Sequence, residues 1–278
     1  MTKIGIADFI NTAPVLETWK RTVSQKKWEL YESTPEVLGN KLAEGNLDLG
    51  LVPSYEYALH PGKYNILSGL SISISGTADS AGSVFLFSHV PLEQLDQSPV
   101  FLSSHSETSI ALVKIILEEF NNIKPVYTIG DINSVKFEDY KGVLAIGDEA
   151  LRLVAESTYL YQFDLGNIWK RQTGLPFVCD VFLVRDEFCS QYQDITDQVH
   201  KELLRCRDEG LASLKEVCTI AAGRIPMPES RCLEYLQTIE YDLDAQKQKG
   251  LVAFIDLLIK RGEADKNVLP LKIYSNLC

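Results

Sequence analysis

The chain has 278 residues, 45% of them hydrophobic, which is enough for two lobes of roughly 100 to 150 residues, each with a core. With 38 acidic and 27 basic residues, its net charge of −11 provides no positive surface for nucleic acid or for an anionic membrane. We therefore expect a small-molecule ligand and no nucleic-acid or membrane partner. An anionic ligand would need local positive potential from backbone amides, helix amino ends or a few cations.

The amino terminus alternates like a strand from Ile4 onward and lacks the apolar segment and cleavage site of a secretory signal. No apolar run approaches the roughly eighteen residues that a membrane span needs. We expect a cytoplasmic protein. The sequence leaves its oligomeric state open.

All six cysteines lie between Cys179 and Cys278, without C-x-x-C and without histidines at ligand spacing. Reduced and mostly buried thiols are expected, with three disulfides as the alternative. The sequence predicts no metal site and no cofactor.

Strands and helices alternate through about residue 185, and the rest of the chain is almost wholly helical. The strands are expected at 4–9, 28–31, 47–52, 66–73, 83–88, 100–103, 126–129, 143–146, 159–163 and 177–184. Helices are expected from Ser33 to Gly45, after Ser106, from Asp148, and over 190–217, 229–240 and 244–262. This order favours an α/β fold with parallel, doubly wound sheets.

No flexible linker separates the two expected lobes, so they must be joined by strands that cross between them. The natural crossings are 83–88 and 177–184. Lobe one then comprises residues 1–88 and 180–278, and lobe two comprises 89–179. Two lobes joined by two hinge strands enclose a central cleft.

Two polar turns follow strands of lobe one. Asn11 and Thr12 come after the first expected strand, and Ser54 comes after the third, because Pro53 cannot extend a β-ladder. Small molecules bind at this edge of α/β sheets, and free amides at helix starts favour anions. The alternative is that these side chains cap helices and meet no ligand.

The corresponding junction of lobe two is rich in hydroxyl groups. Residues 103–109 carry Ser104, Ser106, Thr108 and Ser109 at the start of an expected helix. Capping explains one of these hydroxyls well but not all of them. Two such junctions facing each other would hold a dianion.

Two further turns border the expected cleft. The loop 76–82 leads into Ser83, and the glycine at its end permits close backbone approach to a ligand. Gly147 and Asp148 end a strand and begin a helix. A plain turn and a helix cap are the respective alternatives.

The sequence shows no arrangement for nucleophilic or metal catalysis. The histidines are far apart and have no nucleophile beside them: His60, His89, His105 and His200. No G-x-G-x-x-G or P-loop follows the first strand, which argues against dinucleotides and nucleoside triphosphates.

Taken together, these segments resemble the chorismate dehydratases of the futalosine route to menaquinone, over residues 4 to about 254. The matching pieces are Ile10–Pro14, Asp48–Tyr57, Leu70–Ser73 with Ser83–Ser88, Glu107–Leu112, Ile146–Leu151 and Phe163–Gly166 through Trp169 to Thr173–Phe177. The resemblance implies a cytoplasmic enzyme with a type II periplasmic-binding-protein fold. It also implies catalytic roles for Asn11 and Ser83, and chorismate, a small dianion, as substrate.

The chain departs from that family at two places. Many relatives carry an Arg-x-Ser-Tyr-Leu-Asn-Thr stretch where this chain has Gly5–Thr12, and an Arg in the lobe-two junction where His105 stands. Both changes remove a cation from near the ligand, and the sequence does not identify a replacement.

Two other functions remain open. A sister enzyme of the same pathway makes 1,4-dihydroxy-6-naphthoate and looks to use a histidine in lobe two, whereas this chain has no histidine between 106 and 199. A non-catalytic cytoplasmic small-anion-binding protein would use the same cleft. Conversion of chorismate to an aromatic product would separate these alternatives.

Overall fold

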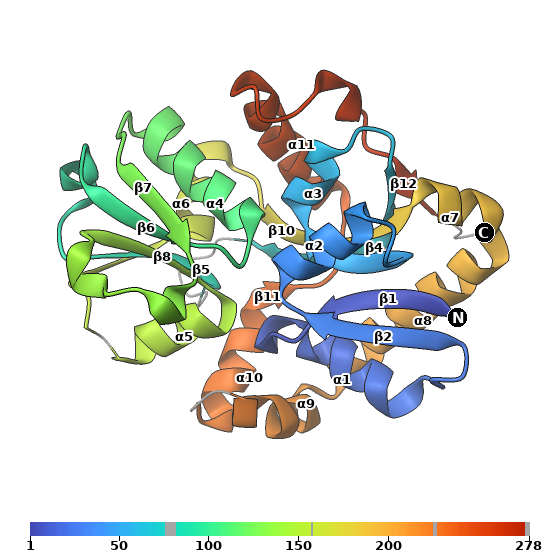
Figure 1. Ribbon diagram of the computed structural model, residues 1–278. Helices are drawn as coiled ribbons and strands as arrows, with labels where there is room; N and C mark the ends of the chain where they lie inside the picture. Colours follow the sequence, from blue (N-terminus) through green and yellow to red (C-terminus); the bar gives the residue numbers. More distant parts are fainter. Residues whose placement is uncertain (76–81, 157, 225–226, 276–278) are drawn as a thin grey trace.

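The computed structural model describes residues 1–75, 82–156, 158–224 and 227–275 and contains two β-sheets, one in each of two lobes (Figure 1). The larger sheet has the strand order β11-β4-β10-β3-β1-β2, with β12 paired to β4. Its strands are β1 (Thr2–Ala7), β2 (Trp28–Ser33), β3 (Leu49–Pro53), β4 (Tyr64–Ile74), β10 (Phe177–Arg185), β11 (Ile239–Glu240) and β12 (Ile273–Tyr274).

The smaller sheet is formed by the middle of the chain, with the order β7-β6-β8-β5-β9. Its strands are β5 (Val84–Ser88), β6 (Pro99–Ser103), β7 (Val126–Gly130), β8 (Gly142–Ile146) and β9 (Tyr161–Asp164). β5 is buried on both faces: Val84 and Leu86 join the main core, while Phe85 and Phe87 pack in a second cluster. Such two-sided burial explains why this strand is apolar without alternation.

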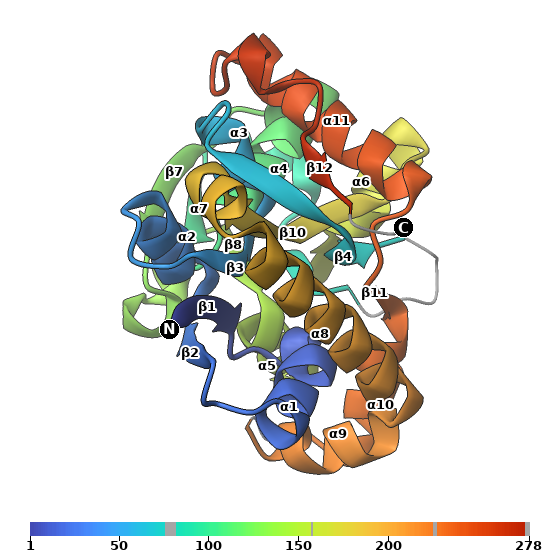
Figure 2. The same ribbon diagram turned by 90° about the vertical axis from the view of Figure 1, so that its right-hand side faces the viewer.

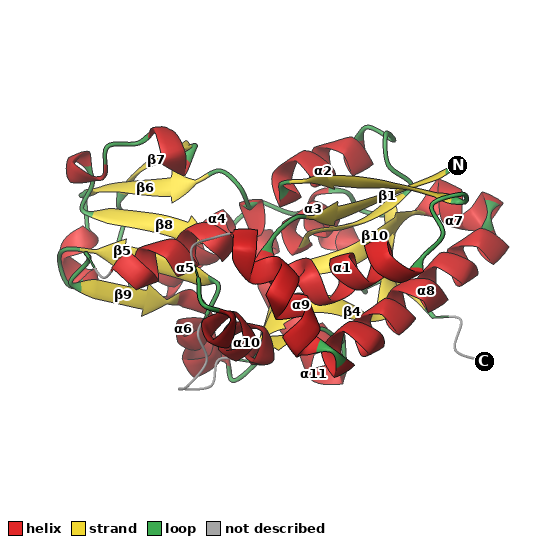
Figure 3. Cartoon of the chain, turned by 90° about the horizontal axis from the view of Figure 1, so that it is seen from below, coloured by secondary structure: helices red, strands yellow, loops and turns green. Residues whose placement is uncertain are grey.

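Helices cover both sheets (Figures 1 and 2). The first five along the chain are α1 (Ala13–Thr22), α2 (Pro35–Ala43), α3 (Ser54–Leu59), α4 (Glu107–Lys114) and α5 (Gly147–Glu156). Those that follow are α6 (Leu165–Thr173), α7 (Asp186–Gln191), α8 (Gln193–Ala212), α9 (Leu214–Ala221), α10 (Glu229–Thr238) and α11 (Ala245–Lys260). Seen from below, α9 and α10 lie near the junction of the two sheets (Figure 3).

The expected two-lobed α/β fold is confirmed, but the expectation of purely parallel sheets was wrong. β10 runs antiparallel to β3 and β4, and β5 runs antiparallel to β8 and β9. The strand before each of them along the chain lies in the other sheet. The right-handed βαβ crossover, which connects parallel strands of one sheet, therefore does not apply to β5 or β10.

Strand pairing also places the crossings differently from the expected hinge strands. β5 hydrogen-bonds only within the smaller sheet and β10 only within the larger one. The chain therefore passes between sheets through residues 75–83 and through α6, and 84–88 goes with lobe two rather than lobe one. Most of the loop 76–82 lies outside the described residues.

The five cysteines in the described part of the chain are buried and form no disulfide there: Cys179, Cys189, Cys206, Cys218 and Cys232. Among the described residues, no helix is long and apolar enough to cross a membrane.

The contact between α1 and α8 requires a glycine. A Cβ added to Gly210 would overlap the backbone carbonyl of Pro14, whereas one added to Gly223 would meet no atom within 4 Å. We expect Gly210→Ala to lower the free energy of unfolding by about 1–3 kcal/mol, because backbone cannot yield as a side chain does. Urea unfolding of this variant beside Gly223→Ala tests the contact, and equal midpoints would contradict it.

Candidate functional site

A small cavity lies between the lobes, where the loop after β1, the start of β5 and the starts of α4 and α5 meet. Its lining residues are Phe9, Asn11, Pro35, Ser83, Val84, Ser106, Ser109, Ile146, Gly147, Cys179 and Asp180. Its volume of about 20 Å³ holds a single water molecule at most, because one water needs about 10–15 Å³. At this point the two lobes therefore lie close together.

Asn11 is placed by a tight turn at the end of β1. The Thr12 hydroxyl donates to the carbonyl of Phe9 at 2.8 Å and also to that of Ala7, which closes the short 3-10 turn η1 (Ile10–Thr12). The Asn11 side chain is 6% exposed, and its Oδ1 has no hydrogen-bond donor among the described residues. A buried polar atom without a partner is costly, so this oxygen is available to a ligand.

Ser83 enters the cavity from the opposite lobe. Its backbone carbonyl accepts from the amide of Gly147 at 2.7 Å, which ties the start of β5 to the start of α5. Gly82 before it approaches Asp164 so closely that a Cβ would overlap that carboxylate. Gly82 therefore permits a close contact with Asp164, whereas the sequence analysis predicted a close approach of its backbone to a ligand.

Behind Ser83 lies the fully buried Tyr235 of α10. Burial raises the pKa of Tyr235 well above its ordinary value, against a smaller lowering effect from Ser83. The phenol therefore stays neutral beside the Ser83 hydroxyl. Sequence reasoning missed Tyr235, since it lies on a helix distant in sequence with no motif around it.

The hydroxyl-rich junction of lobe two divides into different roles. Ser106 caps α4, accepting from the Ser109 amide at 3.4 Å, and both residues line the cavity. The Thr108 hydroxyl oxygen accepts from the amide of Tyr55 at 3.0 Å and so bridges the lobes. Ser104 faces a separate hollow.

Two lobe-one residues predicted to bind substrate are engaged within the protein. The Ser54 hydroxyl is fully buried and donates to the carbonyl of Val178 at 2.9 Å. Thr12 uses its hydroxyl to close its own turn. Neither residue lines the cavity, and each hydroxyl group already donates a hydrogen bond to a backbone carbonyl.

Asp148 holds the two lobes together. Its Oδ1 accepts from the amide of Ile10 at 3.0 Å, across 138 residues of sequence. Burial raises the pKa of Asp148 to about 6, while the Ile10 amide and Arg224 favour the charged form. Arg224 itself pairs with Asp8 at 2.6 Å and with Glu17.

Asp180 on β10 is a lining residue that sequence reasoning missed, although its strand was predicted. It is partly buried, and its carboxyl group has no hydrogen bond or ion pair among the described residues. Burial raises the pKa of Asp180 to about 7. The pairing of β10 with β4 shifts register between Val178 and Asp180, which marks a local irregularity at this point.

His105 lies outside this cavity and is bound to an acid. Its Nδ1 lies 2.8 Å from Oε1 of Glu149, which raises the pKa of His105, and the Ser103 hydroxyl donates to the other Glu149 oxygen at 3.1 Å. The partnership leaves the imidazolium neutralised. Among the described residues, no group of three or more His, Cys, Asp or Glu has metal-binding geometry.

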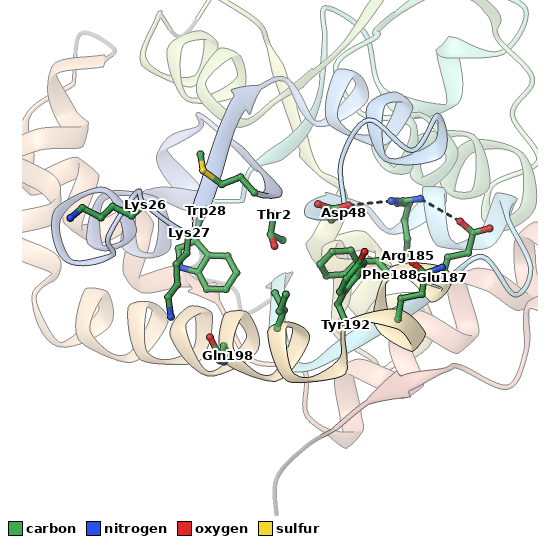
Figure 4. Close-up of a pocket in the computed structure, with 13 residues that line it drawn as sticks. Thr2, Lys26, Lys27, Trp28, Asp48, Arg185, Glu187, Phe188, Tyr192 and Gln198 are labelled. Carbon is green, nitrogen blue, oxygen red and sulfur yellow. Dashed lines mark hydrogen bonds and ion pairs between the residues drawn. The ribbon is translucent and has the colours of Figure 1, made fainter.

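A much larger hollow, of about 920 Å³, lies at the other end of the strands (Figure 4). Thr2 and Trp28, which line it, begin β1 and β2, and Arg185 is engaged with Asp48 at 3.1 Å and with Glu187. Ligands of open α/β sheets bind at the carboxyl ends of strands, so this hollow is at the wrong edge. We place the candidate site at the interlobe cavity.

The sheets, the lobes and the polar cavity between them define a protein with the type II periplasmic-binding-protein fold. A protein from Archaeoglobus fulgidus superposes with a TM-score of 0.73 at 16% identity, covering 94% of this chain and 97% of that one. The periplasmic aliphatic sulphonate-binding protein of Escherichia coli gives 0.65 at 13% identity, covering 99% and 98%. These likenesses concern the fold.

The family follows from sequence. A family model described as menaquinone biosynthesis matches residues 2–260, and the chain belongs to this family. The chorismate dehydratase of Thermus thermophilus is 28% identical over 270 residues, covering 92% of this chain and 94% of that protein. The resemblance to this family is confirmed.

The raised pKa of Asp148 has a consequence for stability. Folding favours the neutral form of the Asp148 carboxyl group. Its contribution to the free energy of unfolding is therefore fully present below pH 3.8 and is lost as the pH rises through about 6. Asp148→Asn keeps an acceptor for the Ile10 amide and avoids the buried charge. We expect it to raise the free energy of unfolding at pH 7 by on the order of 1–3 kcal/mol. Urea unfolding of the wild type and of Asp148→Asn at pH 4 and pH 7 tests this. An equal difference in the free energy of unfolding between the two proteins at both pH values would contradict it.

Proposed function

We propose that the protein is a chorismate dehydratase of the futalosine route to menaquinone, acting in the cytoplasm. The reaction removes water from chorismate to give 3-[(1-carboxyvinyl)oxy]benzoate, so the enzyme is a hydro-lyase. The observation that supports it best is the unpartnered Asn11 Oδ1, buried opposite Ser83 in a chain of the menaquinone biosynthesis family. The assignment also agrees with the name of its Thermus relative.

The chemistry asks little of the protein. Loss of a ring hydroxyl with a neighbouring ring hydrogen makes the product aromatic, so the step is strongly downhill. Orientation of the substrate and hydrogen bonds to the leaving oxygen then supply the catalysis. In this proposal Asn11 orients the leaving hydroxyl or a carboxylate, and Ser83 hydrogen-bonds the reacting part of the substrate. No metal or cofactor is required.

Substrate entry requires the lobes to separate, because ligand pockets usually enclose roughly 300–1,000 Å³ and this cavity has about 20 Å³. Two of the contacts that close it are single hydrogen bonds across the cleft, Tyr55 to Thr108 and Ile10 to Asp148. Such bonds contribute only about 1 kcal/mol each, so the bound substrate can replace them. The hydroxyl groups of Ser106 and Ser109, which line the cavity, then offer donors to its carboxylates.

Two alternatives are less well supported. Synthesis of 1,4-dihydroxy-6-naphthoate would use a histidine of lobe two. His105 does not fit this role, since it is paired with Glu149 and lies outside the cavity. A non-catalytic small-anion-binding protein would bind chorismate without converting it. Turnover therefore decides between the classes.

We expect purified protein, incubated with chorismate without metal or nucleotide, to form an aromatic product detectable by mass spectrometry. Asn11→Ala and Ser83→Ala should each lower kcat by roughly 100-fold or more, because each removes a directional contact to the reacting group. Ser104→Ala is the matched control, since that hydroxyl faces another hollow. Wild-type turnover by both cavity variants would reject their roles, and absence of product from the wild type would reject the function.

A further inference from the structure

We propose that Asp180 in its neutral form is the acid that gives a proton to the leaving hydroxyl group of the substrate. The inference rests on the proposed dehydratase function and adds to it the source of that proton. Asp180 lines the same cavity as Asn11 and Ser83. It comes from β10 of the larger sheet, whose ladder with β3 pairs Asp180 with Pro53.

Asp180 is the single carboxyl group among the described residues that line the cavity. Asn11, Ser83, Ser106 and Ser109 can donate hydrogen bonds, but their protons are too weakly acidic for transfer at neutral pH. Cys179 is equally unsuited, because burial raises the pKa of its thiol well above its ordinary value. By elimination, the acid at this site is Asp180.

Two charged groups, Lys247 and Asp164, are bound to other residues and not to the carboxyl group of Asp180. Lys247, a buried cation of α11, is engaged elsewhere, because it pairs with Glu240, Asp242 and Asp244. The carboxylate of Asp164, before α6, accepts from the Asn167 amide at 2.9 Å.

Among the described residues that line the cavity with Asp180, none is a cation. α4 presents Ser106 and Ser109 to the cavity, and burial together with Glu36 raises the pKa of Glu107 on the same helix. Asp148 of α5 is bound to the Ile10 amide, with Arg224 near it. Glu56 of α3 is bound to Tyr64.

A dianionic substrate strengthens the neutral state of Asp180. Its pKa of about 7 in the ligand-free cavity already allows a neutral carboxyl group near physiological pH. A carboxylate brought close to a second carboxyl group disfavours ionisation further. Asp180 is therefore expected to be protonated when substrate is bound, which also removes the repulsion that an ionised acid would exert.

The proton balance closes without a co-reactant. The ring C–O bond breaks and its electron pair leaves with oxygen, which takes the Asp180 proton and departs as water. The neighbouring ring C–H bond breaks and its pair forms the new ring double bond. The ring proton passes, through a carboxylate of the substrate, to the Asp180 carboxylate. The acid is thereby regenerated.

The pH dependence of the wild-type enzyme gives the first test. The proton-donating form is present below a pKa of about 7 and is lost above it, so kcat/KM for chorismate should fall about tenfold per pH unit on the alkaline side. A flat profile between about pH 6 and pH 9 would overturn the proposal. If the wild type makes no product at all, the proposed function fails and this inference falls with it.

Variants give the second test. Asp180→Asn keeps the shape and can hydrogen-bond but cannot transfer a proton. We expect kcat to fall by roughly 10²–10⁴-fold, with KM within about threefold and the alkaline limb abolished. Asp256→Asn, an exposed acid of α11, is the matched control and should keep the wild-type profile. Wild-type kcat in Asp180→Asn, beside an active wild type, would overturn the role of Asp180 and leave the dehydratase function standing.

Discussion

The closed interface between the lobes leaves polar atoms buried without partners, and this constraint underlies the site. The Asn11 amide oxygen and the Asp180 carboxyl group meet in a space with room for one water. Buried polar groups are costly unless they are hydrogen-bonded. In the proposed function, a polar ligand that hydrogen-bonds to both groups recovers that cost.

The chain passes between the lobes twice, and each sheet keeps its own strands. In the proposed function, the lobes separate to admit the substrate. Glycines at the interface permit the close contact: Gly147 has a φ of +54°, and a Cβ there would press on the Phe9 ring. Asp148 and Thr108 then hold the closed form by hydrogen bonds to backbone amides of the other lobe.

In the proposed function, a chain with a net charge of −11 must hold a dianion. Two basic side chains near the cleft are engaged with acids: Arg224 with Asp8 and Glu17, and His105 with Glu149. We therefore propose that neutral donors contribute to the recognition, namely amides, hydroxyls and, in our inference, a protonated carboxyl group. Burial favours recognition by neutral donors, because it raises the pKa of the acid and strengthens each hydrogen bond.

Much of this protein follows from local sequence. Apolar runs, the Pro35 and Pro53 boundaries and the polar turn at Asn11 predicted the α/β class, the strands and the loop that enters the cavity, because these features depend on neighbouring residues. Tertiary structure decided the rest. The partner of Ser54 lies 124 residues away, at Val178, so its satisfied hydroxyl could not be told from a free one by sequence. Strand direction and the exposure of Asp180 to the cavity likewise depend on which distant strands flank β10, and no local pattern encodes that choice.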